Sequence, residues 1–286
     1  MRKTLLAVLI AALGSIPMIA AADDATATKP DDAKPDEAKP ADAPKPDWTF
    51  AGNVALSTEY LYRGIAQSDR KPAVSGGFDL GHVSGFYVGN WDSSISWISD
   101  GVQAANEAAA AGGGPVNQGT SAPIEMDFYG GYKFGAGPLS FDVGGLEYYY
   151  PLSGFKPDPK PDTFELYVAG TWGPATLKYS QALTNLFGAA DSKNSWYLDL
   201  SATWDLGGGF SVTPHVGHQA VKNSNGGSYT DYNVKVAKDL SGWTLTGGIY
   251  GTNVKSSDPF YNFSTGPAEG HNLGATRVVV SIGKSF

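Results

Sequence analysis

Ionisable side chains in the middle and final thirds of the chain are the residues here that could do chemistry. Glu125 and Asp127 lie two residues apart, so a β-strand would place both carboxylates on one face, at a spacing suited to an acid and a base. No neighbouring group in the sequence would separate their pKa values. We therefore interpret this pair as charges that line a polar interior rather than as a catalytic pair.

The four histidines give little support for a catalytic or metal site. His215 and His218 are three residues apart, so on a strand they point to opposite faces and cannot easily bind one metal ion. A hydrolase with a serine, a histidine and a carboxylate is the main enzymatic alternative, but no spacing places a serine beside either histidine. The sequence predicts no catalytic residue, no metal and no cofactor.

The elements that would position these side chains are β-strands with two unlike faces. In residues 276–286, every second residue counted back from Phe286 is apolar except Lys284 and Thr276, and the residues between them are mostly small or polar. Such a strand is typical of the last strand of an outer-membrane barrel, in which Phe286 would be the assembly signal. The edge strand of a soluble sandwich is the alternative.

Alternating segments of this kind fill the chain from Trp48 onward. They are residues 48–60, 72–82, 85–98, 123–134, 139–150, 162–172, 175–187, 195–205, 210–221, 229–240, 243–253 and 276–286. Short turns at 83–84, 135–138, 173–174, 206–209 and 241–242 alternate with longer loops at 61–71, 99–122, 151–161, 188–194, 222–228 and 254–275. This alternation predicts an all-β fold, a transmembrane antiparallel up-and-down β-barrel of about twelve strands of the outer-membrane type.

Aromatic residues gather at the predicted strand ends, which favours a barrel over a sandwich with a central aromatic core. Trp48, Phe134, Trp172, Trp204, Trp243 and Phe286 adjoin the short turns, and Tyr60, Trp97, Tyr149, Phe187, Trp196 and Tyr229 adjoin the long loops. We expect these two sets to form girdles at the height of the lipid headgroups.

The same alternation assigns charged residues to the lumen. The predicted acids are Glu59, Asp79, Asp92, Glu125, Asp127, Glu165, Asp199, Asp205, Asp231 and Asp239, and the predicted bases are Lys133, Lys178, Lys235 and Arg277. An excess of acids favours cations and cationic solutes in a narrow pore. The alternative is that these charges pair across strands and merely solvate a filled, structural barrel.

The 99–122 loop is rich in Ala and Gly, and residues 104–111 could form a short helix. Either this loop folds inward and constricts the pore, or it forms an extracellular flap.

The chain divides into three parts. Residues 1–22 have the features of a signal peptide, namely Arg2 and Lys3, a short apolar run and a cleavage site at 20–22. Residues 23–47 repeat Lys-Pro among Ala and acids, which predicts a disordered periplasmic tether before the barrel at 48–286. There is no cysteine, so no disulfide framework is possible.

The formal net charge of −8 argues against one class of partner. The signal segment carries +2 and residues 23–47 carry −4, so residues 48–286 hold the remaining −6. A nucleic-acid partner would need a basic face, and we predict none. The expected partners are outer-membrane lipid, the barrel-assembly machinery acting on the C-terminal strand, and small polar or cationic solutes.

Several elements together resemble one known family. They are Gly52-Asn53-Val54-Ala55-Leu56-Ser57-Thr58-Glu59-Tyr60-Leu61-Tyr62-Arg63-Gly64-Ile65-Ala66-Gln67-Ser68, Pro72-Ala73-Val74-Ser75-Gly76-Gly77-Phe78-Asp79, Gly85-Phe86-Tyr87-Val88-Gly89, Tyr129-Gly130-Gly131-Tyr132, Tyr229-Thr230-Asp231-Tyr232 and the final Lys284-Ser285-Phe286. Over 48–286 the chain resembles the TorF-type porins, also known as Gcw-type bacterial proteins of unknown function, although Glu59 stands where that pattern has Asp. The resemblance implies an outer-membrane barrel with porin activity. It implies no catalytic residue and no particular substrate.

Arg63 opens the first long loop beside Gly64, which permits a backbone turn with positive φ. Arg63 could fold back onto the lumen acids Glu59 and Asp79 at the extracellular mouth, either as a gate or as an ion pair that anchors the loop. The sequence therefore predicts a porin-like channel for passive diffusion in the bacterial outer membrane. A non-conducting structural or surface-interaction barrel is the alternative.

Overall fold

The computed structural model describes residues 46–113, 122–151, 160–258, 260–264 and 270–286. The predicted signal peptide lies outside these residues, as does the predicted tether apart from its last two positions. No helix among the described residues is long and apolar enough to cross a membrane.

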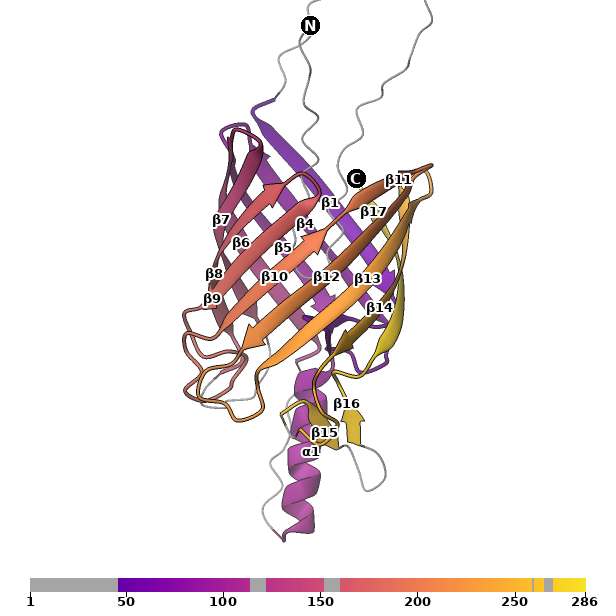
Figure 1. Cartoon of the computed structure of the whole chain (residues 1–286). Coiled ribbons are helices and arrows are strands. Elements are labelled where there is room, and N and C mark those ends of the chain that lie inside the picture. Colours follow the sequence, from indigo (N-terminus) through magenta and orange to yellow (C-terminus); the bar gives the residue numbers. More distant parts are fainter. Residues whose placement is uncertain (1–45, 114–121, 152–159, 259, 265–269) are drawn as a thin grey trace, which may run out of the picture.

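Twelve antiparallel strands form a closed barrel (Figure 1). They are β1 (Trp48–Ser57), β4 (Ala73–His82), β5 (Phe86–Ser94), β6 (Ile124–Ala136), β7 (Leu139–Tyr149), β8 (Thr163–Trp172), β9 (Ala175–Ala182), β10 (Trp196–Ala202) continued by β11 (Trp204–Gly207), β12 (Phe210–Ala220), β13 (Tyr229–Asp239), β14 (Trp243–Thr252) and β17 (Arg277–Ser285). Each strand pairs with its neighbour in the chain, and β1 pairs with β17 to close the sheet. The predicted fold is confirmed, and closure leaves no strand edge unpaired.

The alternation of side chains places an apolar surface on the outside of the barrel. On β17, Val278, Val280 and Ile282 are exposed while Val279, between them, is buried. Phe286, which ends the chain, is 74% exposed. The outer face is therefore suited to lipid, as the sequence predicted.

The predicted aromatic girdles are confirmed at one end of the barrel only. All six aromatic residues beside the short turns are exposed on the outer face. Beside the long loops, Tyr149 is exposed on the outer face, but Tyr60 and Tyr229 are buried inside the barrel. Their assignment to the girdle is wrong, because an alternating pattern near a strand end does not fix which way a loop-borne tyrosine turns.

One predicted strand, 85–98, ends early because a helix begins within it. β5 stops at Ser94, and helix α1 (Trp97–Ala111) contains the predicted helical stretch. Ser96 precedes the helix, and its carbonyl accepts a hydrogen bond from the Asp100 amide at 2.8 Å. The helix projects from the long-loop end, beside the hairpin of β15 (Asn262–Ser264) and β16 (Gly270–Asn272), so it does not constrict the lumen (Figure 1).

The seam between the first and last strands gives a prediction about Phe286. The Gly52 amide donates to the Phe286 carbonyl at 2.8 Å, and the Phe286 amide donates to the Gly52 carbonyl at 3.0 Å. Deleting Phe286 removes both bonds, each worth about 1 kcal/mol, together with an aromatic anchor. The folded fraction after refolding into lipid vesicles, measured by heat-modifiable gel migration, should fall several-fold. Phe50→Ala, at another aromatic residue exposed on the outer face, is the control and should fold almost normally.

Candidate functional site: the barrel interior

The most unusual segment of the barrel is the connection between β1 and β4. Residues 59–68, which we call the plug, are ten consecutive buried residues. Connecting segments normally run over the surface, because buried backbone polar groups need partners. Here the segment turns into the barrel, where it forms the small hairpin of β2 (Leu61–Tyr62) and β3 (Ile65–Ala66).

The plug can enter the barrel because its turn is very tight. Arg63 has φ 46° and Gly64 has φ 76°, which is the two-residue geometry of a hairpin turn with positive φ at both positions. A Cβ atom at position 64 would lie 2.7 Å from the Asp231 Cβ on β13 and 2.7 Å from Thr252 on β14. Glycine is therefore required both by the turn and by the close approach to the wall.

Arg63 crosses the lumen from the plug to the opposite wall. Its Nη1 and Nη2 atoms donate to the two carboxylate oxygens of Glu165, on β8, at 3.0 and 2.7 Å. Nη1 also donates to Gln219 Oε1, on β12, at 2.6 Å, and the guanidinium lies 4.2 Å from the centre of the Tyr197 ring. Arg63 is 7% exposed and Glu165 is 1% exposed, so this is a buried, two-pronged ion pair.

The Arg63 guanidinium keeps its charge in this buried place. Burial by itself would lower its pKa, but Glu165 together with the Tyr62 and Tyr148 hydroxyls more than offsets burial, and the pKa of Arg63 lies well above its ordinary value. We call the ion pair of Arg63 and Glu165 the latch.

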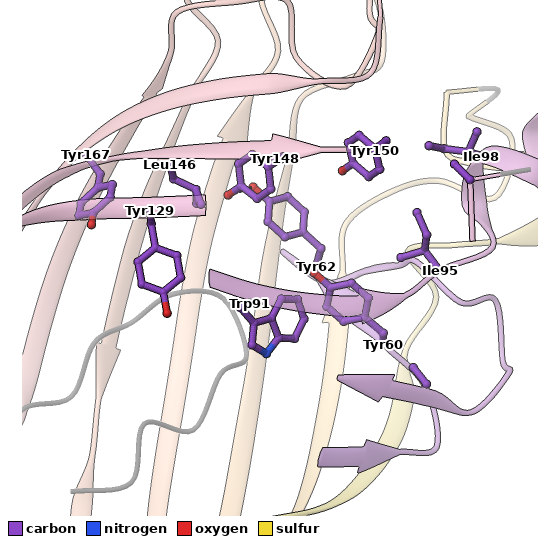
Figure 2. Close-up of a cluster of buried hydrophobic side chains, with 12 residues drawn as sticks. Tyr60, Tyr62, Trp91, Ile95, Ile98, Tyr129, Leu146, Tyr148, Tyr150 and Tyr167 are labelled. Carbon is purple, nitrogen blue, oxygen red and sulfur yellow. Dashed lines mark hydrogen bonds between the residues drawn. The ribbon is translucent and has the colours of Figure 1, made fainter. Parts of the chain in front are cut away.

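Tyrosines on the plug and on the barrel wall also hold the plug in place, as Figure 2 shows. Tyr60 and Tyr150 donate their hydroxyl protons to the two oxygens of Glu125, each at 2.6 Å. The Tyr62 hydroxyl donates to that of Tyr148 at 2.8 Å. Burial, followed by the nearby charges of Glu125 and Asp127, raises the pKa of Tyr60 well above its ordinary value, so Tyr60 remains a donor.

The predicted partners of Arg63 were wrong. Glu59 pairs instead with Arg277, whose Nη1 lies 2.5 Å from Glu59 Oε1, and Glu59 also accepts the Arg70 amide at 2.6 Å. Asp79 accepts the Tyr129 hydroxyl at 2.8 Å. The prediction assumed that Arg63 stays at the mouth, but the hairpin carries it to the far side of the lumen.

Most of the other predicted lumen residues do face inward. Asp199 lies 2.5 Å from His215 Nε2, Asp231 accepts the Tyr197 hydroxyl at 2.9 Å, Lys178 and Lys133 lie over the rings of Tyr167 and Tyr87, and Lys235 lies on the inward face of β13. Asp205 and Asp239 are exposed beside the short turns, where each caps a turn amide. In the described part of the chain no group of three or more His, Cys, Asp or Glu is arranged to hold a metal ion.

Asp92 is the predicted lumen acid that faces the other way. Trp91 and Ser93 on either side of it are buried inside the barrel, and Asp92 pairs in register with Met126 on the outer face of β6. Its neighbour Asn90 donates to it at 2.9 Å. Asp92 shares the outward face of β5 with the exposed Phe86 and Val88, and a polar outward position is tolerated here, near the long-loop end.

Sequence reasoning missed two inward residues. His215 is held between Asp199 at Nε2 and the side chains of Asn233 and Asp231 at Nδ1. Asp142 accepts the Tyr87 hydroxyl at 2.6 Å. Asp142 shares its face with the buried Tyr148, and His215 shares its face with the buried Gln219, so the two-residue period was the signal that could have found them.

The lumen changes character toward the short-turn end. There the inward residues are small and hydroxylated, among them Ser140, Thr171, Ser201, Thr203, Ser211, Thr213, Thr244, Thr246, Ser281 and Ser285. A cavity of about 80 Å³ lies among Asn53, Thr244, Thr246, Ser281 and Ser285 on one side of the plug. The interior is thus filled at the long-loop half by the plug and lined by small polar groups in the other half.

A comparison with protein families identifies the chain. A family model described as "Bacterial protein of unknown function (Gcw_chp)" matches residues 41–286. The chain belongs to the Gcw_chp family. No curated protein sequence matches this Gcw_chp member.

Solved structures similar to this Gcw_chp protein include a porin and an outer membrane channel. A KdgM porin in complex with disordered oligogalacturonate has a TM-score of 0.49 and 8% identity, covering 83% of this chain and 99% of its own. The COG4313 outer membrane channel from Pseudomonas putida F1 has a TM-score of 0.43 and 14% identity, covering 87% of this chain and 100% of its own. At these scores and identities, the function must be argued from the interior of this barrel.

Proposed function

We propose that this Gcw_chp protein is an outer-membrane channel for passive diffusion of small polar or cationic solutes, closed in this conformation by the plug. The observation that carries the proposal is the polar lumen. Small hydroxylated side chains line the short-turn half of the lumen, and charged side chains lie along it, so a hydrated path for solutes would exist once the plug leaves. The earlier resemblance to TorF-type porins supports the same function.

The plug is held by apolar and polar contacts together. Leu61, Ile65 and Ala66 pack in one buried cluster with Tyr229, Tyr250 and Leu273. The ion pair of Arg63 and the tyrosine hydroxyls can be hydrated in a water-filled lumen, whereas the apolar side chains lose their burial when the plug leaves. The flanking residues Asp69 and Arg70 lie outside the buried run, with φ 41° and 62°, and provide a turn about which the plug could swing.

Acids outnumber bases on the inward face of the described residues, which favours cations. The inward acids are Glu59, Asp79, Glu125, Asp127, Asp142, Glu165, Asp199 and Asp231, and the inward bases are Arg63, Lys133, Lys178, Lys235 and Arg277. Two of these acids, Glu165 and Glu59, form ion pairs with arginines. The remainder creates a negative potential along any open path.

The alternative is a non-conducting structural barrel, and the complete burial of ten plug residues is the observation that favours it. In either case we propose that the short-turn end faces the periplasm, where a tether preceding Trp48 would lie. We also propose that the exposed C-terminal Phe286 is presented to the barrel-assembly machinery.

Planar-bilayer recording under a KCl gradient tests the channel, and Asp79 tests its ion preference. Asp79 is half-buried on the inward face of β4 and accepts the Tyr129 hydroxyl at 2.8 Å. Asp79→Asn removes one carboxyl group from the lumen and should lower the K⁺ to Cl⁻ permeability ratio by roughly twofold or more. Asp191→Asn, in an exposed loop, is the matched control and should leave the reversal potential unchanged. Current without cation bias in the unaltered protein would contradict the proposed selectivity.

A further inference from the structure

A second cavity, of about 250 Å³, lies on the long-loop side of the plug. Its walls come from widely separated parts of the chain, including the plug itself through Tyr62 and Gln67, the start of α1 through Trp97, and the loop that holds Phe187. A site built from segments so distant in sequence depends on the folded barrel and the seated plug together. Neither the proposed channel nor its selectivity accounts for this cavity.

The lining of the cavity is aromatic. Tyr62 and Phe187 meet edge to face with ring centres 5.4 Å apart, and Trp97 and Tyr150 meet at 5.5 Å with an angle of 89°. Tyr261 and Tyr229 form a third such pair at 5.0 Å. Rings held by one another at these angles present fixed faces and edges, which a flat ring can stack against.

The polar groups in the lining are few, and most are already engaged. The Tyr62, Tyr150 and Tyr261 hydroxyls donate to Tyr148, Glu125 and the Gly227 carbonyl. No charged side chain lines the cavity. The indole N–H of Trp97 has no hydrogen-bond partner in the described part of the chain, but it is fully buried, so it is closed to the cavity as well. The cavity is therefore lined mainly by ring faces, ring edges and engaged hydroxyls.

We propose that this cavity binds a neutral, planar aromatic molecule of one or two rings, stacked among the Tyr62, Trp97 and Phe187 rings. The volume fits such a molecule, since an apolar cavity of about 150 Å³ holds one benzene ring. The absence of charge in the lining disfavours ions. The engaged hydroxyls disfavour sugars, which need many free polar partners.

Binding tests this site independently of conduction. Coumarin, a neutral two-ring lactone, is titrated calorimetrically into the detergent-solubilised protein, and the titration into protein-free micelles is subtracted. We expect saturable binding with one site per barrel. Phe187→Ala removes one aromatic wall of the cavity and should weaken binding by about fivefold or more. Trp97→Phe replaces another wall by a smaller ring and should also weaken binding, by a smaller factor.

Controls make the outcome decisive. Trp172→Phe, at an exposed tryptophan on the outer face, should bind coumarin like the unaltered protein, and heat-modifiable migration shows that each variant is folded. Maltose, a neutral sugar, should not bind. Absence of saturable coumarin binding, equal binding by folded Trp97→Phe and Phe187→Ala, or preferred binding of maltose would each overturn the proposal.

A second readout rests on the proposed function. Because the plug forms one wall of the cavity, a ligand there favours the plugged state and should reduce channel current in proportion to its occupancy. Coumarin that binds without changing a measurable current would remove this coupling but leave the site. A silent barrel that still binds coumarin would count against the channel alone.

Discussion

Arg63→Ala is expected to raise the time-averaged current through the barrel by at least about tenfold. The change leaves Glu165 as a buried charge without its guanidinium, and breaking such a pair costs roughly 3–5 kcal/mol. Glu165 recovers hydration only when the plug leaves, so most of this cost falls on the plugged state. Each 1.4 kcal/mol is about a factor of ten in an equilibrium constant. The equilibrium between the plugged and the open barrel should therefore shift strongly toward the open state.

The measurement is single-channel recording in planar bilayers, with open probability compared between variants at equal protein incorporation. Arg63→Lys retains the charge but not the two-pronged geometry, so its open probability should lie between those of the unaltered protein and Arg63→Ala. Lys193→Ala is the control, because Lys193 is an exposed basic residue in a loop away from the plug. If Arg63→Ala has the conductance and ion preference of the unaltered protein, the latch between Arg63 and Glu165 does not gate the lumen.

Val234→Arg is expected to destabilise the barrel in lipid by about 2–4 kcal/mol. Val234 is 50% exposed, lies at the middle of β13, and is flanked in register by Pro214 and Ile249. Its side chain therefore faces the hydrocarbon at about mid-depth, where a guanidinium loses its hydration. Urea titration of the barrel folded into lipid vesicles measures the change.

The matched control lies on the neighbouring strand and faces inward. Thr246, on β14, lines the 80 Å³ cavity among small polar side chains. Thr246→Arg places the same charge in a polar interior and should cost less than about 1 kcal/mol. Equal destabilisation by the two arginines would mean that the two faces do not differ as the register indicates.

The strands and their order could be predicted from the sequence because both depend on local patterns. A two-residue period reports the two faces of each strand directly, as in residues 276–286, where the observed exposure follows the predicted alternation. Loop length reports which end of the barrel a connection occupies. These signals need no knowledge of what lies across the lumen.

The contacts across the lumen could not be predicted in the same way. The pairing of Arg63 with Glu165 depends on how far the plug hairpin reaches, and Glu165 lies 102 residues further along the chain. Arg63 was chosen correctly as a notable residue because it precedes a glycine in the first long loop, but the partners nearest in sequence were the wrong ones. The predicted lumen position of Asp92 is wrong for another reason. The phase of β5 turns its neighbours Trp91 and Ser93 inward and Asp92 outward.

The central claim is that the lumen is a channel and that the plug closes it. The Gln67 amide donates to the Tyr60 carbonyl at 2.9 Å, so Asn-Gly in place of residues 61–66 would convert this pair into an ordinary four-residue turn and remove the hairpin. We predict that this plugless barrel, shown to be folded by heat-modifiable migration, gives stable current steps with a cation-biased reversal potential in a KCl gradient. A folded plugless barrel that stays silent would contradict the account and favour a structural role.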